Sequence, residues 1–197
     1  RRKRQGGLHL YWRNSTIALS QRGLGDILVA LKSLPGDVYL HVQGRKSFKH
    51  EELISRIKTL QLTNRVFIHE PYKPEEAVLC ASEYHIGICP EQNTCANQRL
   101  TVSNKLFDYM MAGLAVVVSD LPGISSVVKE AKSGLIFRSG NSDSLAEQIM
   151  FLYNDRALLN KCSENASLYA NTYGNEYFEM KKLQLAIDKV INDSESA

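Results

Sequence analysis

The sequence has no long hydrophobic run and no clustered cysteines. None of its apolar segments reaches the roughly 18 residues that a helix needs to cross a bilayer, and no signal-peptide pattern is present. Its four cysteines form no Cys-x-x-Cys pair and have no ligand-like spacing with the five histidines, so we expect no metal site. Cys80 and Cys89 fall in apolar stretches, which favours reduced cysteines and a cytoplasmic location.

The chain has no net positive charge beyond its first residues. The 197 residues have a net charge of +3, but Arg1, Arg2, Lys3 and Arg4 contribute four positive charges, which leaves −1 for the rest of the chain. Nucleic-acid-binding proteins usually carry positive charge across a folded face, so we expect no nucleic-acid partner. We interpret residues 1–7 as a basic tail or linker, and peripheral contact with the inner face of a membrane stays open for them.

Short apolar runs alternate with helical patterns along residues 8–192, which we interpret as one globular domain with a frayed tail at 193–197. Runs typical of strands lie at 8–12, 38–43, 65–69, 85–89, 115–119 and 135–137. Helices are expected at 23–34, 50–60, 74–81, 104–112, 121–129, 145–153, 157–173 and 175–191, and an irregular polar stretch at 13–22. Strands separated by single helices predict an α/β fold, a doubly wound, Rossmann-like sheet of six parallel strands with extra C-terminal helices.

Ligands of such a sheet bind beyond the carboxyl ends of the strands, near helix N-termini. There Ser103 is expected to cap a helix whose first turn contains Asn104 and Lys105. A lysine at this positive end of the helix dipole lowers the stability of the helix. A bound anion would make the lysine favourable, because the lysine and the dipole would then both attract it. Two interpretations stay open, an anion site and a solvated lysine beside an ordinary cap.

Asp108 shares a helix face with Asn104, about 6 Å further along the axis. That separation suits a carboxylate that accepts hydrogen bonds from a ribose diol while phosphates bind at the helix end, although an ordinary surface aspartate fits as well. Arg22 and Gly23 open another helix, where the guanidinium could bind phosphate and the glycine allows close approach. The dinucleotide fingerprint lacks its third glycine, so we reject an NAD site.

Residues 103–123 resemble the C-terminal, donor-binding domain of retaining glycosyltransferases of family 4, which have the GT-B fold. Supporting similarity lies at 21–24, 42–45 and 83–88, and the resemblance extends from about Leu10 to Ile191. It implies that Arg22 and Lys105 hold the donor diphosphate, assisted by Gly23 and by the backbone amides around Asn104.

The resemblance also assigns the remaining parts of the donor site. Asp108 stands where the family usually has the glutamate that binds ribose, and Gly44 would lie near the base, beside the loop at residues 69–72. The second acid of the family's pair is missing, because Leu100 precedes Asp108 by eight residues. In the loop at residues 91–103, Glu91 is the only acid. It is therefore the candidate catalytic residue, in contact with the sugar.

The resemblance implies hexose transfer from a nucleotide-diphosphate sugar to a sugar or lipid acceptor, with retention at the anomeric carbon and no cofactor beyond the donor. Polysaccharide biosynthesis is the expected context. The N-terminal acceptor domain is missing from the sequence, so we expect this chain to be inactive alone. The alternatives are a non-catalytic nucleotide- or partner-binding module of the same fold, and an epimerase or other relative with the same pocket.

Overall fold

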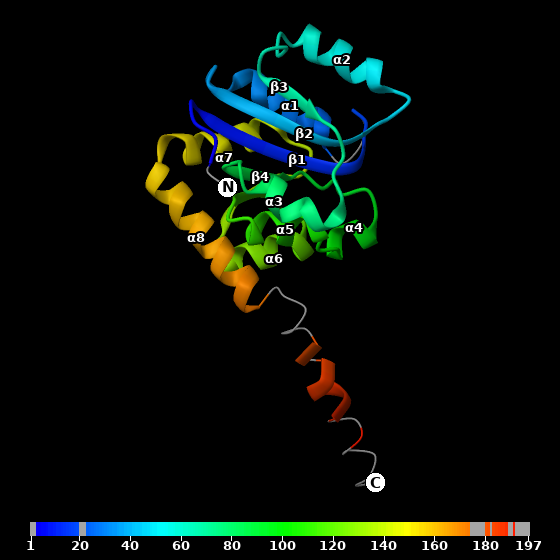
Figure 1. Cartoon of the computed structure of the whole chain (residues 1–197), viewed down its shortest axis with the longest axis vertical. Helices are drawn as coiled ribbons and strands as arrows, with labels where there is room; N and C mark the ends of the chain where they lie inside the picture. The colour runs from blue at the N-terminus through cyan, green and yellow to red at the C-terminus, as the bar shows by residue number, and fades with distance from the viewer. Residues whose placement is uncertain (1–2, 20–22, 174–179, 182, 189–190, 192–197) are drawn as a thin grey trace.

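The computed structural model describes residues 3–19, 23–173, 180–181, 183–188 and 191. It contains one sheet of parallel strands in the order β3-β2-β1-β4-β5-β6, which confirms the predicted six-stranded, doubly wound architecture (Figure 1). The strands are β1 (Leu8–Ile17), β2 (Val38–Lys46), β3 (Val66–His69), β4 (Ile86–Cys89), β5 (Ala115–Ser119) and β6 (Gly134–Phe137).

The helices follow the predicted pattern with one addition. They are α1 (Leu24–Ser33), α2 (His50–Thr59), the 3-10 turn η1 (Pro74–Glu76), α3 (Ala77–Ala81), α4 (Ala96–Leu100), α5 (Asn104–Met111), α6 (Pro122–Ala131), α7 (Ser142–Asn154) and α8 (Arg156–Thr172). Helix α4 lies in a polar stretch for which no helix was expected. Of the helix predicted at 175–191, residues 175–179, 182 and 189–190 lie outside the described residues, whereas 180–181, 183–188 and 191 are helical.

Alternating side chains divide the core into two layers. Leu10 and Trp12 of β1 belong to the cluster packed beneath α1, α2 and α7, whereas Tyr11 between them belongs to the cluster beneath α3, α5 and α6. These helices are labelled in Figure 1. Strand β5 behaves in the same way, with Val117 on the first face and Val116 on the second. Both faces are therefore apolar in the centre of the sheet, as a doubly covered parallel sheet requires.

The expectation of an irregular stretch from residue 13 is wrong as far as Ile17. Strand β1 continues beside β2, with Arg13 opposite Gln43 and Thr16 opposite Arg45, so that β1 contains one extra residue, a bulge at positions 14 and 15. Gly44 lies across from this bulge with φ of 152°, and a Cβ there would collide with the Asn14 carbonyl oxygen. Pairing with β2 outweighs the polar composition of this segment.

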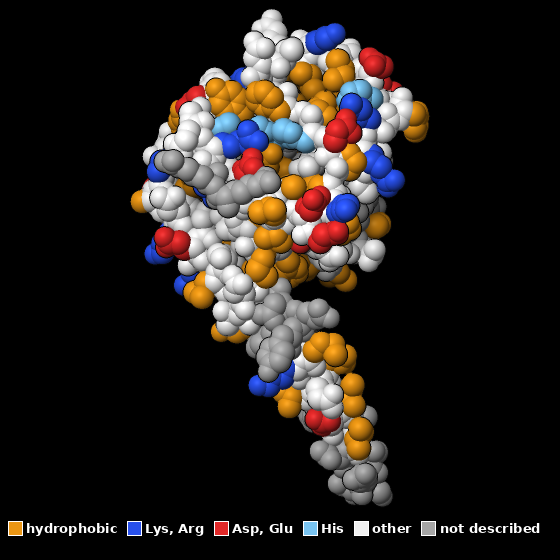
Figure 2. Space-filling view, in the orientation of Figure 1, with side chains coloured by type: hydrophobic (Ala, Val, Ile, Leu, Met, Phe, Trp, Pro, Cys, Tyr) orange, Lys and Arg blue, Asp and Glu red, His pale blue; other side chains and the backbone are white. Residues whose placement is uncertain are grey.

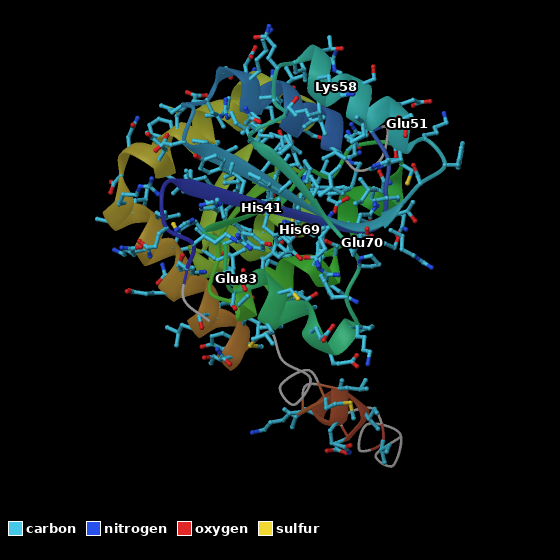
Figure 3. The ribbon with its side chains drawn as sticks, turned by 45° about the horizontal axis from the view of Figure 1, so that its top comes forward. His41, Glu51, Lys58, His69, Glu70 and Glu83 are labelled. Carbon is cyan, nitrogen blue, oxygen red and sulfur yellow. The ribbon has the colours of Figure 1, made fainter. Side chains whose placement is uncertain are left out.

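Four histidines form a hydrogen-bonded row on the α3 side of the sheet. The Nδ1 atom of His85 accepts from the backbone N–H of His9 at 3.0 Å. The ring nitrogens of His9 and His41 lie 2.9 Å apart, as do those of His41 and His69. His41 and His69 lie side by side in Figure 3, and pale-blue histidine side chains reach the surface in Figure 2.

The contact between His9 and the backbone carbonyl of Gln5 determines which ring nitrogen of each histidine carries the proton. The carbonyl of Gln5 can only accept, so Nε2 of His9 carries the proton and Nδ1 of His9 accepts from Nε2 of His41. By the same reasoning, Nδ1 of His41 accepts from Nε2 of His69. Protonation of His9 or His41 would therefore replace an acceptor with a second donor and break a hydrogen bond.

The first described residues contact this side of the domain. Lys3, which the sequence places in the basic tail or linker, donates from Nζ to the carbonyls of Tyr84 at 2.6 Å and Gly113 at 3.0 Å. Arg4 forms an ion pair with Glu83 at 2.9 Å. Burial lowers the pKa of Lys3 to about 8. Residues 3 and 4 thus bind to the segment before β4 and to the residue that precedes β5 by two positions, and Gln5 contacts His9 at the end of the histidine row.

We predict that acid destabilises this domain through the histidine row. Burial lowers the pKa of His41 from 6.5 to about 3 and that of His85 to about 4. Below about pH 6.5 the unfolded chain binds protons that the folded chain does not, so the unfolding free energy falls by up to about 1.4 kcal/mol per pH unit and group. Urea unfolding at a series of pH values measures this slope.

The matched variant is His41→Gln, because an amide can donate to His9 and accept from His69 without a titrating group. We expect the slope of unfolding free energy against pH to become shallower between about pH 6.5 and pH 4 by one proton's contribution. Equal slopes for wild type and His41→Gln would contradict the assignment.

Candidate functional site

A cavity of about 670 Å³ opens at the carboxyl ends of β1 and β2. This edge of the sheet is where ligands of doubly wound folds bind, and the strand order reverses there, between β1 and β4. The cavity has walls from β1, β2, the segment after β3, and α5. Its lining residues are Arg13, Asn14, Ser15, Gln43, Gly44, Arg45, Pro71, Tyr72, Pro74, Ala77, Asn104 and Asp108.

Asp108 faces this cavity from the second turn of α5, on the same helix face as Asn104, as the sequence spacing predicts. Its carboxylate is bound to the guanidinium of Arg13 in a partly buried ion pair, with 27% of the aspartate side chain and 23% of the arginine side chain exposed. The arginine was not expected from the sequence. Asp108 is therefore not a free surface aspartate, and a ribose could bind its carboxylate only in exchange for Arg13.

Tyr109 fixes the position of Arg13 relative to α5. Burial raises the pKa of Tyr109 well above its ordinary value, so its hydroxyl stays protonated. That hydroxyl accepts a hydrogen bond from the backbone N–H of Arg13 at 3.0 Å. The ring packs against Gly87 of β4, where a Cβ would collide with it. One side chain of α5 thus binds the helix to both strands at the point where the strand order reverses.

Lys105 and Glu91 form a second ion pair beside the cavity. Nζ of Lys105 lies 2.5 Å from Oε1 of Glu91, and only 6% and 10% of their side chains are exposed. The anion beside Lys105 in this structure is a carboxylate of the chain itself. The alternative of a solvated lysine is wrong, because Lys105 is buried.

The helix end differs from the prediction at Ser103. Its hydroxyl makes no capping hydrogen bond, and among the described residues this buried oxygen has no hydrogen-bond partner. The first turn is closed instead by the backbone, where Leu106 N–H donates to the Ser103 carbonyl at 3.0 Å. Ser103 therefore begins α5 through its extended backbone and leaves its hydroxyl available.

Gly23 begins α1 next to this helix end. Its φ of 68° lies in the left-handed region, and a Cβ would collide with the carbonyl oxygen of Pro90. The glycine therefore allows the start of α1 to contact the backbone directly before Glu91. Arg22, the other phosphate-binding candidate in this turn, lies outside the described residues.

The predicted site residues fall into two groups. Gly44, Asn104 and Asp108 line the cavity, whereas the others that the structure describes do not and lie beside it at the beginnings of α1 and α5, namely Gly23, Glu91, Ser103 and Lys105. Sequence reasoning missed Arg13 and Arg45, because both lie around a bulge that no local pattern announced. The one available signal was polar residues at the end of a central strand.

The rim of the cavity has a weaker ion pair. Glu70, labelled in Figure 3, follows β3 and pairs with Lys46 at 2.9 Å, with 73% and 52% of their side chains exposed.

Within the described ranges, no three His, Cys, Asp or Glu side chains are arranged to hold a metal ion. No helix in the described part of the chain combines the length and apolar character that crossing a membrane requires.

The sequence profile of the family described as glycosyl transferases group 1 matches residues 18–168. No match was found among curated proteins. Solved structures of the same fold include a glycosyltransferase from Rickettsia africae, with a TM-score of 0.78 at 15% identity, where the match covers 95% of this chain and 49% of that one.

Two further structures have the same fold. Anabaena Alr3699/HepE, solved in complex with UDP, has a TM-score of 0.77 at 18% identity, over 95% of this chain and 49% of that chain. The C-terminal domain of the group 1 family protein LpcC from Francisella tularensis has a TM-score of 0.67 at 16% identity, over 84% and 86%. This chain therefore spans about half the length of the Rickettsia and Anabaena proteins.

We predict strong energetic coupling between Glu91 and Lys105. Glu91→Leu or Lys105→Met alone leaves a buried charge without its partner and should lower the unfolding free energy by about 3–5 kcal/mol. The double variant removes both charges and should lie close to wild type, within about 1–2 kcal/mol. Chemical unfolding of the three variants and the wild type gives the coupling energy.

The exposed pair Lys46 and Glu70 is the matched control, and its coupling should be about 0–1 kcal/mol. Additive effects of the two substitutions at Glu91 and Lys105 would show that the pair does not form in solution.

Proposed function

The chain belongs to the family of glycosyl transferases group 1, and from this membership we propose that it is the donor-binding domain of a retaining, family 4 enzyme with the GT-B fold. Its substrate is a nucleotide-diphosphate sugar, from which a hexose passes to a sugar or lipid acceptor. One observation carries the proposal, the cavity between β1, β2 and α5 into which Asp108 and Asn104 face one helical turn apart. Their separation matches that of a ribose and its phosphates.

The donor is held along α5. Its diphosphate lies at the N-terminal end of the helix, where the dipole, the backbone amides and the Lys105 ammonium favour an anion. Arg22 and Gly23 contribute from the beginning of α1. The ribose hydroxyls donate to Asp108, and the base lies toward Gly44 and the segment at 69–72. Support for this orientation comes from the cavity lining, which includes Gly44, Pro71 and Tyr72.

The chemical step breaks the bond between the anomeric carbon and the diphosphate oxygen, and the electron pair leaves with the nucleoside diphosphate. The acceptor oxygen bonds to the anomeric carbon, and its proton passes to the departing diphosphate oxygen. Negative charge develops on the diphosphate, and Lys105, Arg22 and the helix end stabilise it. Glu91 contacts the sugar once phosphate has taken its place beside Lys105. No cofactor other than the donor takes part.

The other half of the enzyme supplies the acceptor site. The chain spans about half the length of the Rickettsia and Anabaena relatives, which supports a division into a donor domain at residues 8–192 and a separate N-terminal acceptor domain. Residues 1–7 serve as a linker, of which Lys3 and Arg4 contact the domain, and the tail expected at 193–197 lies outside the described residues. Turnover, in the context of polysaccharide biosynthesis, requires both domains, so this chain alone is inactive. We place its action in the cytoplasm; peripheral membrane contact stays open, and Lys3 and Arg4 of the basic segment are bound to the domain.

We predict that nucleoside diphosphates stabilise the chain against thermal unfolding. UDP is the first probe, because Anabaena HepE was solved with it, and GDP and ADP complete the series. At 100 times its dissociation constant a ligand adds about 2.7 kcal/mol to the unfolding free energy. Asp108→Ala should weaken binding of every diphosphate that binds the wild type by about tenfold or more, because the ribose hydroxyls lose a charged acceptor.

Asp143→Asn, on the exposed start of α7, is the matched control and should bind as the wild type does. If no nucleotide of the series binds the wild type, the non-catalytic module becomes the better interpretation. If a nucleotide binds, the chain is joined to an acceptor domain and turnover is measured. Turnover indicates an enzyme, and its absence indicates a nucleotide-binding module.

A further inference from the structure

Arg13 occupies the place in which a ribose would have to bind. Its guanidinium is paired with the Asp108 carboxylate and lies over the ring of Tyr72, 5.9 Å from the ring centre. All three residues line the same cavity. The Nε–H of Arg13 is buried and has no hydrogen-bond partner among the described residues. The arginine therefore has donor capacity that its present partners leave unused.

A neutral ribose is a poor competitor for this carboxylate. Two hydroxyl groups can donate to Asp108, but they cannot compensate Arg13 for the loss of its anionic partner. A partly buried guanidinium without a counterion is costly, because it has been withdrawn from water. A nucleoside alone would have to meet that cost from its own contacts.

A diphosphate changes this balance. Phosphate oxygens are strong, charged acceptors, and a planar guanidinium binds two of them at once. Asn104, at the beginning of α5, lines the same cavity as Arg13 and lies about 6 Å along the helix from Asp108. The backbone of Arg13 stays fixed by the hydroxyl of Tyr109 while the side chain turns.

We propose that Arg13 is a latch that makes phosphate a condition for ribose binding. The latch rests on the function proposed above. In the closed position Arg13 pairs with Asp108; in the open position it binds the donor diphosphate and leaves Asp108 to the ribose hydroxyls. The ligands that open the latch are nucleoside diphosphates and their sugars, and nucleosides are excluded. Arg13 is thus a specificity-determining residue.

Calorimetric titration of a nucleoside and its diphosphate tests the latch. The probes are uridine and UDP, followed by guanosine with GDP and adenosine with ADP. In the wild type the diphosphate should bind at least about 100-fold more tightly than its nucleoside, because charge-assisted contacts are worth about 1.5–3 kcal/mol each. Arg13→Gln should raise the nucleoside affinity about tenfold and lower the diphosphate affinity about tenfold, since one such contact is transferred.

The rise in nucleoside affinity is the decisive result, because loss of an ordinary binding residue cannot produce it. Arg45→Gln removes the other cavity arginine, which has no ion pair among the described residues; it should weaken diphosphate binding without strengthening nucleoside binding. Arg156→Gln, on α8, should change neither affinity. Arg13→Lys keeps the charge without the planar fork and should lie between wild type and Arg13→Gln. Thermal unfolding confirms that each variant is folded.

Failure of the latch and failure of the proposed function give different results. If the wild type binds a diphosphate but Arg13→Gln and Arg13→Lys bind the nucleoside no better than the wild type does, the latch is wrong and the donor site stands. If the wild type binds neither UDP, GDP nor ADP, both proposals are overturned. If the double variant Arg13→Gln with Asp108→Ala binds the nucleoside as tightly as Arg13→Gln alone, the freed carboxylate is not the cause, and the latch is again excluded.

Discussion

Charge compensation along α5 is the constraint on which the site depends. Two carboxylates and two cations lie there partly or almost wholly out of water, as the pairs Arg13–Asp108 and Lys105–Glu91. Removal of an ion from water costs several kcal/mol, so none of the four can lose its partner unless another group of opposite charge or strong polarity replaces it. Binding at this helix is therefore an exchange of partners.

Helix α5 and its contacts with the sheet position both ion pairs. Helix α5 is joined to β4 by the contact of Tyr109 with Gly87, and to β1 by the hydrogen bond from Arg13 to the same tyrosine. Arg13 and Asp108 depend on that connection, and Lys105 lies on the same helix. The bulge that Gly44 permits in β1 lines the cavity beside them. A rigid strand and helix therefore present side chains whose partners can change.

Sequence reasoning predicted what hydrophobic periodicity controls. Strands and helices, the parallel sheet and the helix that begins at Asn104 follow from spacing and from single-helix crossovers, both of which are local. The bulge, helix α4 and the missing Ser103 cap could not be predicted, because each depends on contacts with distant residues. The two ion pairs were missed for the same reason: Arg13 precedes Asp108 by 95 residues. Only the tertiary fold brings the two residues of each pair together.

The two pairs together explain how a site with so few charges could select a composite ligand. Inorganic phosphate can compete with Glu91 for Lys105, but it offers nothing to Asp108 once Arg13 turns away. A nucleoside can offer hydroxyls to Asp108, but it leaves Arg13 without an anion and the Lys105–Glu91 pair closed. Only a molecule that contains ribose and diphosphate supplies new partners to all four groups at once. Under the proposed donor binding, discrimination comes from the cost of opening each pair for an incomplete ligand, whereas a ligand that contains both ribose and diphosphate compensates every charge.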